Sequence, residues 1–446
     1  MSQPGIRAAS LVTISCLGVF AGGVQHAAHA QAVNGSPLPA NVRKHAMKVA
    51  GIDYVDYKIL LHVTLNDTLD GLMILDTGGD TLLFPNVARD LKLSLETIPD
   101  TKLALTRLAH VTFGAVEIKN IQTFVAPLFI QSWDKDHPGS KLLGLLGIET
   151  LKDWAVGIDI PSRTSAWWEG GKITQDDVRS FNSVYHDPNG AKYSVKASPR
   201  RESISAAGQL LSNDGLELAE AQSVRLYKKH FDDHFDAHSY FQAKLDDYTG
   251  EFALDTGAHD VSVTAQVGAR LHPLLTRHGE SLSAYGTFRV DQVFVRALKI
   301  GDIAFDFPTV AIQPPSDRPD EGGILDVSFV GITPFEKCRI VMDFPGQMLY
   351  VSPHKGYNKS PYHGIMSMGL YPKKSSSESP CPMTVFAGFP AELAGMKDGD
   401  SVVSINGTSF AEFNASDEGF LHKPIVLVVN RKGASMPITI TIPALK

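Results

Sequence analysis

Alternating apolar and polar positions dominate the chain, and they predict short β-strands rather than long helices. Two stretches show this pattern most clearly, YKILLHVTLNDTLDGLMILDTG and YFQAKLDDYTGEFALDTG. Each is typical of a strand, a turn at Asn66-Asp67 or Asp246-Asp247, and an apolar strand that enters an Asp-Thr-Gly triplet. The sequence therefore predicts the same strand-turn-strand unit twice.

Two later blocks repeat in the same order. HVTFGAVEIKNIQTFVAP matches QVFVRALKIGDIAFDFPTVAIQP, and each is expected to form a pair of strands, with the first turn at Lys119-Asn120. LLGIETLKDWAVGIDIPSRTSAWW matches FVGITPFEKCRIVMDFPGQMLYV without a gap, which aligns Gly147 with Gly331. Long-period self-similarity is typical of paired copies of one unit. The repeat predicts two β-rich lobes related by a pseudo-two-fold axis.

The Asp-Thr-Gly triplets place one carboxylate at the end of an apolar strand in each copy. A pseudo-two-fold axis brings Asp76 and Asp255 together if both turns lie between the lobes. Gly78 and Gly257 allow tight turns and the close approach of another backbone. Two adjacent carboxylates share one proton, so one can activate water while the other hydrogen-bonds a scissile carbonyl. This pattern indicates amide hydrolysis with water as the nucleophile.

These motifs resemble those of the pepsin-like and retropepsin-like aspartic proteases, in the two-lobed single-chain form of bacterial exported members. The matching residues are Asp76, Thr77 and Gly78, then Asp255, Thr256 and Gly257, and two apolar residues before each of Gly147 and Gly331. The resemblance covers roughly residues 54–352, apart from a long insert. It implies that the two aspartates are catalytic and that the two threonines hydrogen-bond across the lobe interface. It also implies a polypeptide substrate and no metal or other cofactor.

The sequence departs from the family pattern in two places. Pepsin-like enzymes usually carry a hydroxyl residue after the triplet, whereas Gly79 and Ala258 occupy those positions here. Ala is the retropepsin choice, but Gly is expected to loosen the first turn. The flap of the family has no clear match, and it is expected within Thr97 to His110.

The segment between the two copies, residues 170–238, breaks the repeat. Its stretch HDPNGAKYSVKASPRRESISAAG is polar and rich in turn residues, which is typical of an exposed linker. His230, His234 and His238 follow at helical spacing with aspartates between them, and such a face could bind zinc. Alternating Phe residues equally favour strands, and a solvated polar face is the alternative to a metal site.

The sequence pattern changes in the carboxyl-terminal residues. GFPAELAGMKDGDSVVSINGTSF predicts a short helix, a turn, a strand and a hairpin turn at Asn406-Gly407. This run resembles a PDZ domain, which implies that a peptide adds as a strand in a groove. The carboxylate-binding loop is expected near Gly369 and Leu370. The alternative is that this module only packs against the protease and stabilises it.

The amino terminus predicts an export signal. Arg7 precedes a short apolar stretch, Ala8 to Val24, and small residues end at Ala30. We expect a periplasmic or secreted protein after cleavage near Ala30, and the alternative is a membrane anchor. The segment Gln31 to Met47 could be a short propeptide.

Composition and charge limit the expected partners and types of site further. The chain has 446 residues and a formal net charge of -7, so nothing favours nucleic acid or an anionic membrane as a partner. Only Cys338 and Cys381 follow the signal, which excludes a disulfide scaffold and a cysteine-rich zinc site.

The sequence thus predicts a mostly β, two-lobed aspartic protease fold with a small α+β PDZ-like domain. The predicted function is an aspartic endopeptidase. The rivals are an inactive scaffold that binds peptides through its cleft and PDZ domain, and a metalloprotein that uses the His230 segment. The predicted boundaries are residues 1–30 for the signal, 31–170 for lobe 1, 171–236 for the insert, 237–355 for lobe 2 and 360–446 for the PDZ-like domain.

Overall fold

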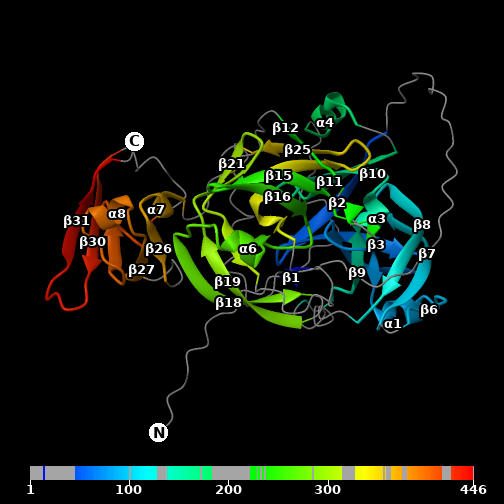
Figure 1. Cartoon of the computed structure of the whole chain (residues 1–446), viewed down its shortest axis with the longest axis horizontal. Coiled ribbons are helices and arrows are strands. Elements are labelled where there is room, and N and C mark those ends of the chain that lie inside the picture. Colours follow the sequence, from blue (N-terminus) through cyan, green and yellow to red (C-terminus); the bar gives the residue numbers. More distant parts are fainter. Residues whose placement is uncertain are drawn as a thin grey trace, which may run out of the picture.

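Strands form most of the regular structure of the chain, as the sequence predicts, and the helices are short (Figure 1). The computed structural model describes residues 14–15, 46–99, 102–127, 137, 139–170, 173–182, 221–228, 230–231, 234–235, 238–283, 286–313, 327–354, 357, 363–373, 379–413 and 423–444. The helices are α1 (Pro85–Asp90), α3 (Ile148–Leu151), α4 (Gln175–Asn182), α6 (Ala265–Gly268), the 3-10 helix η7 (Thr333–Phe335), α7 (His363–Ser367) and α8 (Pro390–Leu393). Within these described residues, no helix is long and apolar enough to cross a membrane.

The largest sheet draws strands from both copies of the repeat. In spatial order it contains β12 (Gln222–Arg225), β25 (Met348–Pro353), β24 (Cys338–Asp343), β10 (Trp154–Asp159), β11 (Thr164–Glu169), β2 (Lys48–Val55), β3 (Lys58–Leu65), β4 (Leu69–Asp76), β9 (Leu142–Gly147), β5 (Leu82–Leu83), β8 (Val116–Val125), β7 (Ala104–Phe113) and β6 (Glu96–Thr97). The first copy therefore shares a sheet with the last strands of the second copy.

A second sheet belongs mainly to the second copy. Its order is β1 (Ile14–Ser15), β18 (Leu275–Ser283), β19 (Gly286–Phe294), β22 (Thr309–Ile312), β17 (Val261–Val263), β23 (Phe329–Val330), β16 (Tyr248–Leu254), β15 (Tyr240–Leu245), β20 (Ala297–Ile300) and β21 (Ile303–Asp306). Separate from it are the small hairpin of β13 (His230–Phe231) and β14 (His234–Phe235), and a C-terminal sheet described below.

The two copies use the same strand pairings, which confirms the predicted repeat. In the first copy β4 pairs in parallel with β9, and β5 lies antiparallel on the other side of β9. In the second copy β16 and β17 pair with β23 in the same two senses. The equivalent strands β10 and β24 pair antiparallel with each other, with Gly157 opposite Val341. This symmetric ladder places the pseudo-two-fold axis between the copies.

One predicted turn was wrong. β7 and β8 turn at Gly114-Ala115, and β8 continues through Lys119 and Asn120, although Asn120 takes a left-handed φ of 57°. Gly114 takes a positive φ of 52°, which suits it to a tight two-residue turn. Lys119 and Asn120 are instead exposed residues of the strand. The polar pair therefore marks a solvent-facing stretch rather than a strand end.

A long hairpin follows α6 in the second copy. β18 and β19 pair over nine residues each, directly after α6. At the matching place after α1, the described residues of the first copy contain the two-residue strand β6. In the segment Thr97 to His110, where the flap is expected, Thr97 pairs with Ala104, and the residues from Ala104 onward belong to β7.

The first part of the insert is packed rather than exposed. Helix α4 buries Phe181 and Val178 against Trp168 and its neighbours in β10, β24 and β25. The rings of Trp168 and Phe181 lie edge to face, 6.0 Å apart. Trp167 and Trp168 are both fully buried at the end of β11. The polar stretch that predicted a linker, residues 186–208, lies outside the described residues.

The C-terminal residues form a sheet of their own. It contains β26 (Leu370–Pro372), β27 (Cys381–Val385), β28 (Ser401–Ile405), β29 (Thr408–Ser409), β30 (Ile425–Asn430) and β31 (Ile438–Ile442). The predicted short helix and the hairpin turn at Asn406-Gly407 are confirmed as α8 and the β28–β29 turn. Cys381 is buried in this sheet and Cys338 in the shared sheet, and neither forms a disulfide among the described residues.

This C-terminal unit packs against the base of the β18–β19 hairpin, at one end of the molecule (Figure 1). Phe294 at the end of β19 contacts Tyr371 of β26, with ring centroids 4.9 Å apart. The Arg296 guanidinium lies 4.8 Å from the centre of the Phe389 ring. Apolar and cation-π contacts together therefore join the unit to the second copy.

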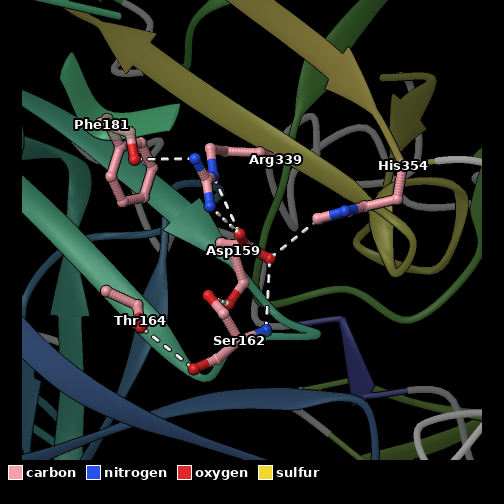
Figure 2. Close-up of polar contacts among 6 residues, drawn as sticks. All are labelled: Asp159, Ser162, Thr164, Phe181, Arg339 and His354. Atoms are coloured by element: carbon pink, nitrogen blue, oxygen red, sulfur yellow. Dashed lines mark hydrogen bonds and ion pairs between the residues drawn. The ribbon is translucent and has the colours of Figure 1, made fainter. Parts of the chain in front are cut away.

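A buried ion cluster joins the two copies inside the shared sheet (Figure 2). Arg339 on β24 donates two hydrogen bonds to Asp159 on β10, one of them at 2.8 Å, and a third at 2.7 Å to the Phe181 carbonyl of α4. The His354 ring reaches the other oxygen of Asp159 at 3.1 Å. Burial favours a raised pKa for Asp159, but the hydrogen bonds from His354 and Arg339 outweigh it and lower that pKa.

We expect Arg339→Met to lower the free energy of unfolding by about 3–5 kcal/mol at neutral pH. The reason is that Asp159 would keep its charge inside the sheet without its main partner. The Asp159 pKa is lowered in the fold, so this pair stabilises above the unfolded pKa and its contribution is lost as the pH falls through the folded pKa. Urea unfolding at pH 7 and below pH 4 measures both effects.

Arg163→Met is the matched control, because Arg163 is largely exposed and lies 3.8 Å from Asp53. Asp53 itself is buried, but Arg163 is half exposed and Asp53 keeps its 2.7 Å contact with His62, so this pair contributes about 0–1 kcal/mol. Equal losses in the Arg163 and Arg339 variants would contradict the role given to the buried cluster.

Candidate active site

Asp76 and Asp255 lie at equivalent places in the two copies. Asp76 is the last residue of β4, beside Gly147 of β9. Asp255 follows the last residue of β16, and its N–H donates to Val330 of β23 at 3.1 Å. In both copies the apolar strand is flanked by buried strands, so the chain must turn at the aspartate. The two Asp-Thr-Gly turns, residues 76–78 and 255–257, then face each other.

Four hydrogen bonds between the two threonines and the opposite strands hold the Asp-Thr-Gly turns together. Thr77 Oγ1 donates to Leu254 O at 2.9 Å and accepts from Thr256 N at 3.0 Å. Thr256 Oγ1 donates to Leu75 O at 2.8 Å and accepts from Thr77 N at 3.1 Å. Both threonines are buried, so these bonds satisfy polar groups that have no access to water.

The glycines let the carboxyls cross to the opposite turn. A Cβ atom added to Gly78 would overlap the carboxyl of Asp255, and one added to Gly257 would overlap the carboxyl of Asp76. Each carboxyl therefore lies directly against the glycine of the other lobe. Any side chain at either glycine would push the opposite carboxyl out of place.

Burial and mutual repulsion control the protonation of the pair. The side chains are almost wholly buried, and burial raises the pKa of Asp76 well above its ordinary value. The charge of Asp255 raises the pKa of Asp76 further. Burial also raises the pKa of Asp255, where the positive charges of His238 and Lys58 act against it. The two carboxyls consequently share one proton over a range of pH.

The two carboxyls differ in their hydrogen bonds. Asp255 Oδ1 accepts from Gly257 N at 2.9 Å and from Ala258 N at 3.0 Å. Asp76 Oδ1 accepts from Gly78 N at 3.0 Å. Donated N–H bonds stabilise the ionised form, so the charge is favoured on Asp255 and the proton on Asp76. The Oδ2 atom of each has no hydrogen-bond partner among the described residues.

The comparisons with known proteins bear on this same region. Residues 241–329 match the family model of aspartyl proteases. This stretch contains Asp255, Thr256 and Gly257 and ends beside Gly331. No curated protein matches the chain.

Two solved structures resemble the chain at low identity. A retropepsin-like aspartic protease from Rickettsia conorii is 16% identical, with 31% of this chain and 94% of that chain covered and a TM-score of 0.22. The aspartic proteinase from Irpex lacteus is 9% identical, with 71% of this chain and 99% of that chain covered and a TM-score of 0.37. Scores this low carry no argument about the site, which rests on the geometry above.

Apart from His238, the residues of the other predicted sites lie away from this centre. Gly369 and Leu370 are in the C-terminal unit, where Gly369 O accepts from Phe386 N at 2.7 Å and Leu370 begins β26. His230 and His234 lie in the β13–β14 hairpin, so the helix that would align three histidines is not formed. Strand pairing overrides the helical spacing there.

Of three residues near the aspartates, Lys58 and Asp80 were missed in the sequence, and His238 was considered only as a metal ligand. Lys58, at the start of an apolar strand, is buried and donates to Gly257 O. His238 Nε2 lies 2.8 Å from Gly78 O. Asp80 is just beyond the first turn, and burial together with the charge of Glu149 raises its pKa to about 6. The only signal in the sequence was a lysine placed where an apolar residue would be expected.

We expect Asp76→Asn to raise the free energy of unfolding by about 1–2 kcal/mol at neutral pH. The folded pKa of Asp76 is raised, so its favourable contribution is complete below the unfolded pKa and is lost as the pH rises through the folded pKa. An amide stays neutral and avoids that loss. Urea unfolding should show the gain at pH 7 and its disappearance below about pH 4.

Asp153→Asn serves as the control for this measurement, because Asp153 is exposed. Its free energy of unfolding should change by less than about 0.5 kcal/mol at either pH. A stability gain for Asp76→Asn that is the same at both pH values would contradict the charge explanation.

Proposed function

We propose that the protein is an aspartic endopeptidase whose catalytic residues are Asp76 and Asp255. The observation that carries the proposal is the crossed geometry, in which each carboxyl lies against the glycine of the opposite turn. The match of residues 241–329 to the aspartyl protease family supports it. Polypeptide is the substrate class, and neither a metal nor another cofactor takes part.

In the proposed mechanism the two carboxyls exchange one proton with the substrate. Ionised Asp255 takes a proton from a water molecule, whose oxygen adds to the peptide carbonyl carbon. Protonated Asp76 gives its proton to the carbonyl oxygen, and a tetrahedral diol forms. When the C–N bond breaks, the proton held by Asp255 passes to the leaving nitrogen, and one diol hydroxyl returns a proton to Asp76. The Oδ2 atoms, which have no partner in the described chain, are suited to these transfers.

We expect Asp76→Asn and Asp255→Asn each to lower the rate of cleavage of an unfolded protein by about 10²–10⁴. Each variant keeps the shape of the site but removes one proton carrier. Cleavage of labelled casein measures the rate, with Asp153→Asn as the control that keeps full activity. A pepstatin-like inhibitor should abolish wild-type cleavage, whereas a chelator should not.

The same assay separates the rival functions. Absence of cleavage by the wild type, with peptide binding retained, would favour the inactive scaffold. Cleavage that survives in both Asn variants and is stopped by a chelator would favour a metal site.

The export signal expected at residues 1–30 lies outside the described residues, apart from Ile14–Ser15, and we propose a periplasmic or secreted location on the sequence alone.

We also propose that residues 360–446 form a PDZ-like module that binds polypeptide ends. The supporting observation is that β26, which begins at Leu370, is the edge strand of its sheet. An edge strand can pair with an added strand, and the loop before Leu370 would receive a terminal carboxylate. The contacts of Phe294 and Phe389 would keep this edge next to the protease.

We expect a labelled peptide with a free C-terminus to bind at least about 10-fold more tightly than its amidated form, because one tenfold step corresponds to about 1.4 kcal/mol of carboxylate recognition. Fluorescence anisotropy measures this in Asp76→Asn with the cleft blocked by a pepstatin-like inhibitor. Equal affinity for both peptides would leave the module with a packing role alone.

A further inference from the structure

Two basic side chains cross between the lobes and reach the Asp-Thr-Gly turns. Lys58 is the first residue of β3 in the first copy, and its ammonium donates to the carbonyl of Gly257 in the second copy. His238 precedes β15 in the second copy, and its Nε2 lies 2.8 Å from the carbonyl of Gly78 in the first. Each Asp-Thr-Gly turn is therefore contacted by a basic residue from the other lobe.

These two residues occupy equivalent positions. The β3–β4 ladder pairs Leu60 with Ile74, so Lys58 stands opposite Asp76 two steps further along. The β15–β16 ladder pairs Tyr240 with Ala253, and the same two steps bring His238 opposite Asp255. The pseudo-two-fold axis thus relates a lysine to a histidine beside the catalytic pair.

The Lys58 contact leads through one peptide group to Asp255. The Gly257 carbonyl that accepts from Lys58 shares its peptide group with the N–H of Ala258. That N–H donates to Asp255 Oδ1 at 3.0 Å. Hydrogen bonds in a chain polarise one another, so a cation on the carbonyl strengthens the N–H bond to the carboxylate. Lys58 therefore favours the ionised form of Asp255 through the backbone as well as directly.

Among the described residues, few charged side chains face the two carboxyls. The positive charges that face the two carboxyls are Lys58 from β3 and His238 from the segment before β15, and both oppose the rise in the pKa of Asp255. Asp80, in the turn after β4, faces His238, Glu149 and Lys228. Lys58 is buried, so water screens its charge little.

Resting on the proposed protease function, we propose that Lys58 and His238 are positioning residues of the catalytic pair. Lys58 holds the second Asp-Thr-Gly turn and directs the negative charge to Asp255. His238 donates to the first turn from the opposite lobe. The charge of Lys58 sets the pH range in which the pair carries a single proton.

The decisive measurement is the pH profile of kcat/KM for Lys58→Met. Loss of a nearby positive charge raises the pKa of both carboxyls, so both limbs of the profile should move to higher pH by about one unit. Lys58→Arg keeps the charge, and its profile should stay in place even if its rate falls. Lys244→Met removes the same net charge from an exposed position on β15, and its profile should match the wild type.

A Lys58→Met profile that stays in place, at whatever rate, would overturn the role of the charge, because a purely structural lysine would change the rate and not the pH limbs.

If Lys58→Met fails to fold, His238 still tests the crossed contacts. His238→Gln keeps an N–H donor and should retain most of kcat, whereas His238→Leu should lose at least about 10-fold. Equal losses in the Gln and Leu variants would overturn the proposal for His238.

A second readout does not depend on activity. Carbon-13 NMR titration of the aspartate carboxyls, assigned with Asp76→Asn and Asp255→Asn, should show higher pKa values in Lys58→Met than in the wild type. Unchanged titration in a folded Lys58→Met protein would refute the inference alone. Absence of aspartate-dependent cleavage by the wild type would refute the proposed function instead, so the two failures are distinguishable.

Discussion

The structure depends on a set of buried hydrogen bonds that neither lobe can make by itself. Thr77 and Thr256 each place a hydroxyl and a backbone N–H at the interface, and each needs the other lobe to satisfy them. An unpaired buried polar group costs about 1–3 kcal/mol, so separation of the lobes would be expensive at this point. This requirement fixes how closely the two aspartates approach and hence that they share a proton.

The shared sheet also holds the two lobes together, at a distance from the aspartates. The β10–β24 ladder continues one sheet from the first copy into the second. Across this ladder Arg339 forms an ion pair with Asp159. Helix α4 covers this seam with Phe181. The two halves are thus held at two levels, by neutral hydrogen bonds near the aspartates and by an ion cluster in the sheet.

Much of this architecture could be predicted because its cause is local. Strand alternation and the repeated triplets predicted the two copies, their strand-turn-strand units and both aspartates. The turn at Lys119-Asn120 failed because a polar pair inside a strand resembles a turn when no partner strand is known. Helix α4 was not predicted, because its apolar face packs against Val341 and Tyr350, which are far away in the chain.

The surroundings of the aspartates were harder to predict, for a physical reason. Asp159 and Arg339 are 180 residues apart in the chain, and no local pattern marks such a pair. Lys58 begins an apolar strand, where a lysine usually extends its amine to water, and only the second lobe explains its burial. The spacing of His238 to His230 and His234 predicts a helical face, and the strand pairing that excludes this helix depends on residues that no local pattern shows.

The two Asp-Thr-Gly turns have different neighbours, and this difference has a consequence that an exact two-fold symmetry would forbid. In an assembly of two identical chains, the proton would have equal energy on either carboxyl, and each substrate would meet a random one of two arrangements. Here Lys58 and Ala258 favour one site for the charge. The single chain removes this equivalence, so under the proposed function a bound peptide would meet two carboxyls with different roles.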